Sequence, residues 1–187
     1  MTRVLILLIA AAFVFHAKSA FAQMVDTRDI MGFGPNFTSA SPIQREVVYF
    51  QSRYAPGTIV ISTRERRLYL VLPNGQALRY GIGVGRDGFR WGGVHRISAK
   101  KEWPSWTPPA QMLRRRPDLP RFMKGGIDNP LGARALYLGS TLYRIHGSNE
   151  PETIGHAVSS GCFRMTNEDV KDLYDRVSVG TMVVVQN

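Results

Sequence analysis

Residues 143–165 read YRIHGSNEPETIGHAVSSGCFRM and contain the only cysteine of the chain, Cys162. The same segment holds two of the four histidines, His146 and His156. Cys162 follows His146 by 162 − 146 = 16 positions and lies in a Ser-Ser-Gly-Cys turn between two apolar stretches. A lone thiol on such a turn, with a histidine presented by an earlier strand, is the arrangement that thiol-dependent acyl transfer requires.

The glycines of this segment fit the same chemistry. A free thiol has a pKa of about 8.5 and is mostly protonated at neutral pH, so a neighbouring imidazole must lower that pKa or accept the proton. Gly161 lets the backbone turn sharply, which can direct successive N–H groups at one oxygen and form an oxyanion hole. Gly147 can offer its carbonyl oxygen to hold the imidazole of His146. We therefore predict a Cys/His site.

Short runs of β-branched and aromatic residues flank this segment and are separated by turn residues such as Pro73-Asn-Gly75. The first three runs predict an antiparallel meander. One helix is predicted to begin at Thr166, because Asp169 stands three residues later as in a capping box. The expected fold class is mainly β, with one principal helix after the cysteine. The predicted strands are residues 58–63, 67–72, 76–84, 94–99, 135–138, 142–145, 161–165 and 181–185.

Residues 1–22 have the three parts of a secretory signal peptide. A short basic start ending at Arg3 precedes the apolar run Val4–Phe15, and Ala20-Phe-Ala22 is a cleavage signal. The apolar run is short for a membrane-spanning helix, which needs about 20 residues. We therefore expect secretion across the inner membrane, cleavage after Ala22 and no stable membrane anchor afterwards.

The remaining chain divides into an extension, residues 23–55, and a domain, residues 56–187. Residues 43–54 of the extension fit a short helix or an edge strand. Within the domain, residues 100–134 are rich in proline, contain Trp103 and Trp106, and have no sustained periodicity. A loop of this length in a compact domain is usually functional or disordered. We interpret it as a partly ordered lid or substrate wall; the alternative is a surface insertion without catalytic consequence.

Export restricts what the single cysteine can do. Exported proteins usually pair their cysteines, so an unpaired one is a buried apolar residue, an intermolecular link or a reactive thiol. A zinc site formed by Cys162, His146 and His156 fits no common ligand spacing. We therefore predict no metal and no cofactor, and we interpret His156 as a loop histidine. The net charge of +10 favours polyanionic partners or a solvated basic surface, but no nucleic-acid motif accompanies it.

At Ile145-His-Gly-Ser148 and Ser159-Ser-Gly-Cys-Phe-Arg-Met165 the sequence resembles the L,D-transpeptidase catalytic domain, the YkuD-like family. The resemblance extends from about residue 58 to residue 185. It implies a β-sandwich-like domain with the thiol in a pocket under a lid. By this resemblance Cys162 is the nucleophile, His146 the general base, and Gly147 the residue whose carbonyl orients the histidine.

Four further positions match the part of the motif that shapes the oxyanion and substrate-binding pocket: Ser159, Ser160, Gly161 and Arg164. Ser160 departs from the usual pattern, since many members have histidine there. Serine has no imidazole, so the role of this position is open, whereas the nucleophile and its base are unaffected.

The reaction implied by the resemblance is peptidoglycan cross-linking in the periplasm. The thiolate attacks the third residue of a tetrapeptide stem at its L-centre, D-alanine leaves, and a thioester forms. The amine of a second stem then gives a 3→3 cross-link; an outer-membrane protein is an alternative acceptor. Two other functions stay open: a hydrolase that uses the same site on stems or stem–protein links, and a non-catalytic cell-wall binding module.

Overall fold

The structure is a computed structural model, and it describes residues 41–187. The expected signal peptide, residues 1–22, and residues 23–40 of the expected extension lie outside the described residues. Within residues 41–187 no helix combines the length and the apolar character needed to cross a membrane.

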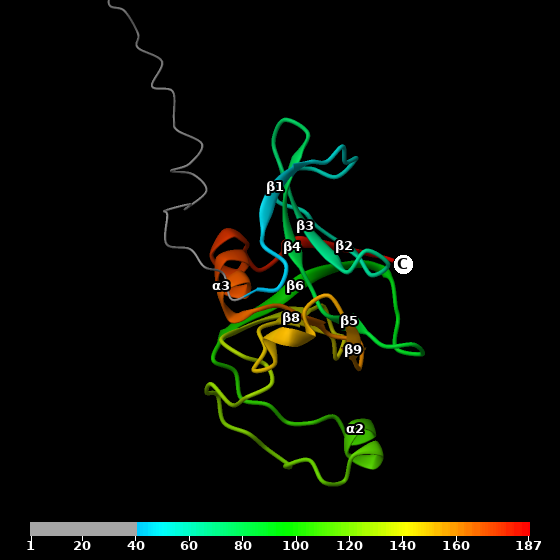
Figure 1. The fold of residues 1–187 in the computed structure, drawn as a ribbon, viewed down its shortest axis with the longest axis vertical. Helices are drawn as coiled ribbons and strands as arrows, with labels where there is room; N and C mark the ends of the chain where they lie inside the picture. The colour runs from blue at the N-terminus through cyan, green and yellow to red at the C-terminus, as the bar shows by residue number, and fades with distance from the viewer. Residues whose placement is uncertain (1–40) are drawn as a thin grey trace, which may run out of the picture. The chain divides into compact units, whose positions relative to one another are not determined.

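β-Strands make up most of the regular secondary structure of the described residues (Figure 1). One sheet has the strand order β1-β4-β3-β2-β11-β6-β7-β8-β10, and β5 and β9 pair separately. The strands are β1 (Glu46–Tyr49), β2 (Ile59–Ser62), β3 (Arg67–Leu72), β4 (Gln76–Gly81), β5 (Val84–Gly85), β6 (Gly93–Glu102), β7 (Arg134–Leu138), β8 (Arg144–His146), β9 (Ala157–Ser159), β10 (Phe163–Arg164) and β11 (Met182–Gln186). The helices are α2 (Ala110–Arg115), the 3-10 helix η1 (Pro151–Thr153) and the principal helix α3 (Asn167–Arg176). The predicted mainly β fold with one principal helix is confirmed.

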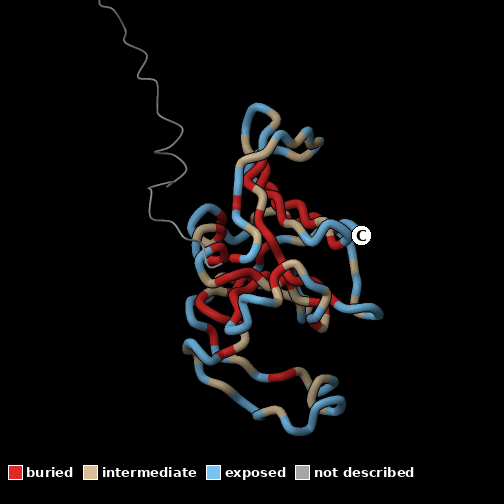
Figure 2. Tube along the Cα trace, in the orientation of Figure 1, coloured by how far each residue is buried: buried red, intermediate tan, exposed pale blue. Residues whose placement is uncertain are grey.

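The long strand β6 joins two halves of the sheet. Its first part pairs with β11, which in turn runs parallel to β2, and its second part pairs with β7. A register shift between Ile97 and Ala99 lies at the start of the pairing with β7. One apolar core contains buried residues from both halves and from α3, and Figure 2 shows these residues concentrated along the strands. The core includes Ile59, Leu68, Tyr80, Leu136, Ile145, Phe163, Val170 and Leu173.

The predicted meander is confirmed, because β2, β3 and β4 pair antiparallel in sequence order. Its third strand is shorter than predicted: β4 ends at Gly81, and β5 pairs with β9 instead. Gly81 lies against Ile43, so close that a Cβ on the glycine would stand 2.6 Å from the Cβ of Ile43. Residues 43–54 contribute β1, which pairs with β4, so the edge-strand alternative is the one observed.

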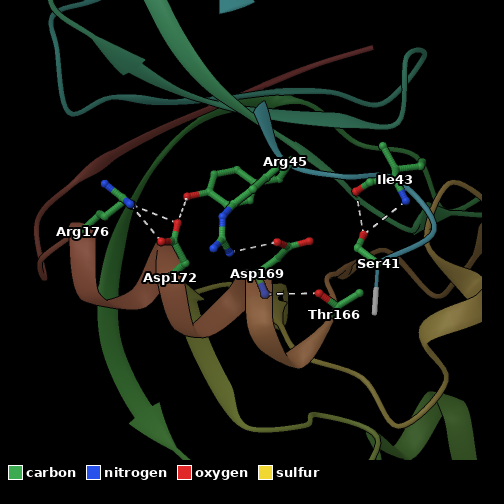
Figure 3. A network of polar contacts seen from close by, with 8 residues as sticks. Ser41, Ile43, Arg45, Thr166, Asp169, Asp172 and Arg176 are labelled. Carbon is green, nitrogen blue, oxygen red and sulfur yellow. Dashed lines mark hydrogen bonds and ion pairs between the residues drawn. The ribbon is translucent and has the colours of Figure 1, made fainter. Parts of the chain in front are cut away.

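A polar network connects the start of the described chain to α3 (Figure 3). The Thr166 hydroxyl accepts a hydrogen bond from the Asp169 N–H at 3.2 Å, which confirms the predicted N-cap. The Asp169 carboxylate is fully buried, and Nη1 of Arg45 lies 3.3 Å from its Oδ1. Nearby, Asp172 accepts hydrogen bonds from the Tyr80 hydroxyl at 2.5 Å and from Arg176 at 2.9 Å. The segment before β1 is thereby tied to the helix that follows the cysteine.

Replacing Arg45 by methionine is expected to lower the free energy of unfolding by roughly 3–5 kcal/mol, because Asp169 would keep a buried charge without its cation. Urea unfolding followed by circular dichroism measures this loss. The matched control is Arg90→Met, which removes an exposed ion pair to Asp87 and should cost less than about 1 kcal/mol. Equal, small losses in the two variants would contradict a structural role for the buried pair.

Candidate active site

Two neighbouring strands bring the predicted cysteine and histidine together. β8 and β10 are parallel, with Phe163 opposite Ile145 and Arg164 opposite His146. Cys162 directly precedes β10, and His146 is the last residue of β8. Both residues line one cavity of about 340 Å³. The structure therefore places the two side chains on a common wall.

His146 is buried, with 5% of its surface exposed. Its Nδ1 lies 2.6 Å from the carbonyl oxygen of Gly147. A carbonyl oxygen only accepts, so Nδ1 carries the proton and Nε2 is the basic nitrogen. Burial lowers the pKa of His146 to about 3, and the positive charges of Arg164 and Arg144 act in the same direction. The imidazole is thus neutral at neutral pH, which a general base requires.

The thiol of Cys162 is also uncharged in the resting site. Its Sγ lies 3.9 Å from the carbonyl oxygen of Leu142, and the residue keeps intermediate exposure. Burial raises the pKa of the Cys162 thiol, while the charge and hydrogen-bonding groups of Arg144 partly oppose the rise. The pair is therefore a thiol and a neutral imidazole, and the imidazole is able to accept the thiol proton.

Alkylation of Cys162 by iodoacetamide is expected to accelerate with pH from about pH 6 to about pH 9 without levelling off near neutrality, because only the thiolate reacts. The midpoint should lie above that of the same cysteine in urea-unfolded protein, since burial raises the pKa of the folded thiol. Mass spectrometry of timed samples gives the rates. A rate that is already constant below pH 7 would indicate a preformed thiolate–imidazolium pair instead.

The turn before the thiol is held by side chains. Ser159 Oγ donates to the carbonyl oxygen of Cys162 at 2.6 Å and accepts from the Gly161 N–H at 3.1 Å. Trp91 Nε1 donates to the Gly161 carbonyl oxygen at 2.7 Å. Gly161 has φ of 110°, and a Cβ there would lie 2.4 Å from Cε1 of Tyr143. The Gly161 N–H is thus engaged, whereas the Cys162 N–H has no acceptor among residues 41–187.

Of the other residues considered in the sequence, some line the cavity that contains Cys162 and His146, whereas His156 does not. Ser160 and Arg164 line the cavity, and Arg164 forms an ion pair with Glu150 at 2.6 Å. His156 lines neither this cavity nor the neighbouring one. Within the described residues no three histidine, cysteine or carboxylate side chains gather as a metal site. Of the three residues of the zinc alternative, His156 is therefore not brought together with Cys162 and His146.

The predicted loop, residues 100–134, is observed as residues 103–133 between β6 and β7, because both strands extend into the predicted range. It includes the short helix α2 and contributes one wall of the cavity. Trp106, Met112 and Leu131 line the cavity together with Arg115. The Arg115 guanidinium lies over the ring of Phe89, 5.0 Å from its centroid, which connects α2 to the segment between β5 and β6. These contacts favour the interpretation as a substrate wall.

Three residues of the site were not predicted: Trp91, Tyr143 and Arg144. The Trp91 and Tyr143 rings stack at 4.4 Å beside Gly161. Arg144 lines the cavity with His146. Residues two apart on a strand share a face, so the spacing of Arg144 and His146 was a usable signal. Trp91 lies far away in sequence, and nothing in its local pattern connects it to the cysteine.

Comparison with known proteins identifies the family. The sequence model of the YkuD family, described as the L,D-transpeptidase catalytic domain, matches residues 56–185. The probable L,D-transpeptidase ErfK/SrfK of Escherichia coli is 40% identical over 136 residues, 68% of this chain and 43% of the relative. The chain thus matches less than half of the length of that curated relative.

The solved structures similar to the chain include one of high and one of low sequence identity. A Brucella melitensis protein named a probable carnitine operon oxidoreductase is 50% identical, with a TM-score of 0.52, over 78% of this chain and 94% of its own. L,D-transpeptidase 3 of Mycobacterium tuberculosis, with a faropenem-derived adduct, is 16% identical, with a TM-score of 0.57, over 70% of this chain and 60% of its own. The second likeness concerns the fold alone. The oxidoreductase name belongs to another reaction class, and the family match over residues 56–185 is independent of it.

Proposed function

The chain belongs to the L,D-transpeptidase catalytic-domain family, and on this basis we propose that it is an exported L,D-transpeptidase acting on peptidoglycan peptide stems. Cys162 is the nucleophile and His146 the general base. The observation that carries the proposal is the buried imidazole of His146, whose Nδ1 lies 2.6 Å from the Gly147 carbonyl oxygen in the cavity that contains the thiol.

The first half-reaction makes a thioester. Nε2 of His146 accepts the thiol proton while sulfur forms a bond to the carbonyl carbon at the L-centre of the third stem residue. The Cys162 N–H, which has no acceptor within the described chain, can donate to the resulting oxyanion. The C–N bond then breaks, and His146 returns the proton to the amine of the departing D-alanine.

The second half-reaction resolves the thioester. The side-chain amine of a diamino acid in an acceptor stem attacks the carbonyl carbon and loses a proton to His146. The C–S bond breaks, and the sulfur regains that proton. The product is a 3→3 cross-link; with an amine of an outer-membrane protein, it is a protein attachment.

A second cavity supports transfer to a peptide acceptor. It measures about 440 Å³ and adjoins the first, because several residues line both. Ser159 and Ser160, from the turn before the thiol, are among them, as are Arg115 and Arg164. Two cavities that meet at the turn offer space for two stems, with the thiol lining the first of them. Hydrolysis needs no acceptor site and is the less favoured function.

Product analysis tests the proposal. Purified protein is incubated with disaccharide-tetrapeptide, and the products are separated by chromatography and identified by mass spectrometry. Cross-linked dimers with release of D-alanine support transfer. Shortened monomers alone would show a hydrolase, and unchanged substrate would contradict both reactions.

Export is the second part of the proposal, and it is supported by the basic start, the apolar run and the Ala20-Phe-Ala22 signal. N-terminal sequencing of protein recovered from the periplasm should begin at Gln23. Full-length protein in the cytoplasm would contradict export.

A further inference from the structure

Arg144 stands beside the reacting sulfur without a role in the mechanism above. The pairing of β8 with β10, continued by one residue, places Arg144 next to Cys162. Arg144 also lines the cavity that contains Cys162 and His146. Its guanidinium is held over the ring of Tyr137, 5.1 Å from the centroid, and Nη1 donates to the Leu142 carbonyl oxygen at 3.1 Å.

The charge of Arg144 is not neutralised by the protein. Arg164, on the same cavity wall, pairs with Glu150, and Arg134 pairs with Glu102. Arg144 forms no ion pair with any carboxylate of residues 41–187. Its Nε is buried and has no hydrogen-bond acceptor within the same residues. A guanidinium on a cavity wall that has no carboxylate partner among residues 41–187 is suited to a bound anion, and above all to a carboxylate.

The contacts of Leu142 connect this cation to the chemistry. The Leu142 carbonyl oxygen accepts from Nη1 of Arg144 and lies 3.9 Å from Sγ of Cys162. The guanidinium and the thiol are therefore anchored to the same atom. This shared contact places the guanidinium and the sulfur on the same side of the cavity wall.

We propose that Arg144 is a substrate-binding residue that holds the free carboxylate of the leaving residue of the acyl donor. In a tetrapeptide stem this carboxylate is three bonds from the attacked carbonyl carbon, through the amide nitrogen and the α-carbon of D-alanine. Donors that end at this residue are selected, because an amide or a further residue there removes the charge that Arg144 binds. The inference rests on the proposed function for the identity of the donor.

Paired alkylating reagents test the anion site without any enzyme assay. Iodoacetate and iodoacetamide form the same S–CH₂ bond and expel iodide, but only iodoacetate carries a carboxylate. A change in the thiol pKa alters both rates equally, so the ratio of the two rates reports how strongly the site attracts an anion. Loss of Arg144 should lower the iodoacetate-to-iodoacetamide ratio about tenfold, the effect of one charge-assisted hydrogen bond.

The variants are Arg144→Met and Arg144→Lys, with Arg64→Met as the control. Arg64 is exposed, lines neither cavity and changes the net charge by the same amount. We expect a low ratio in Arg144→Met, partial recovery in Arg144→Lys, and the wild-type ratio in Arg64→Met. An unchanged ratio in folded Arg144→Met, judged by circular dichroism, would overturn the anion site.

Donor selection is tested with a disaccharide-tetrapeptide and its C-terminal amide. The wild type should acylate faster on the free acid, and Arg144→Met should lose about tenfold on the acid and little on the amide. Equal losses on the two donors would overturn the carboxylate assignment. Failure of the proposed function gives a different result from failure of the anion site. The wild type would then act on neither donor, whereas the alkylation ratio would still report the anion site.

Discussion

Replacing Cys162 by alanine is expected to reduce acyl transfer by roughly 10⁴-fold or more, because the reaction has no covalent intermediate without the sulfur. The family relationship also leads us to expect that a carbapenem acylates the wild-type thiol. Intact-protein mass spectrometry should then show one adduct on the wild type and none on Cys162→Ala. The substitution removes one sulfur atom at a partly exposed position, so the fold should persist.

Two outcomes would contradict this assignment. An adduct that survives in Cys162→Ala would place the nucleophile at another residue. A folded wild type that forms neither adduct nor cross-linked product would favour a non-catalytic cell-wall binding module. Cys162→Ser is the matched control for the shape of the side chain, because it replaces the thiol by a hydroxyl of similar size. It should lose most of the activity with little change in stability.

Replacing His146 by glutamine is expected to lower acyl transfer about 10²- to 10⁴-fold, the usual contribution of a general base. Glutamine can still donate a hydrogen bond to the Gly147 carbonyl oxygen, but it cannot accept the thiol proton. Turnover of disaccharide-tetrapeptide measures the loss, and Cys162 should remain open to alkylation. Turnover within a factor of three of wild type would remove His146 from the mechanism.

The same variant has a distinct pH signature in stability. Burial lowers the pKa of His146 to about 3 in the folded protein, whereas an unfolded histidine titrates near 6.5. Between these values the unfolded chain binds one more proton, so stability falls as the pH falls. From pH 6.5 to pH 5 the wild type should lose about 2 kcal/mol more than His146→Gln, at about 1.4 kcal/mol per pH unit. Equal losses in urea unfolding would contradict the buried neutral state.

The sequence predicts the strands whose signals are local. β3 has the predicted bounds, because the apolar and aromatic run of residues 68–72 follows Arg67 and ends at a Pro-Asn-Gly turn. The end of β4 depends instead on packing, since Ile43 meets Gly81 from a distant part of the chain. β9 has only three residues within a polar loop and pairs with the two-residue strand β5. Both strands are too short to show an alternation of apolar and polar residues in the sequence.

The site shows the same division. The spacing of His146 and Cys162 on successive strand ends predicts that they share a wall, and they line one cavity. The Gly161 N–H, expected among the oxyanion donors, is engaged by Ser159 through a turn geometry that the residue types do not reveal. The wall residues of the 100–134 loop and Trp91 reach the cavity through tertiary contacts. Their identity as site residues requires the folded chain.

The position of β11 has a consequence for how fast the domain forms. This strand lies between β2 and β6, in the middle of the sheet, and Val183 pairs with Ile59, 183 − 59 = 124 positions earlier. Closing so long a loop costs chain entropy before the contacts of β11 form and compensate for it. We therefore expect the domain to fold slowly compared with helical domains. Until β11 is in place, β2 and β6 are open edges to which another chain can add, and the partly folded protein is prone to aggregate.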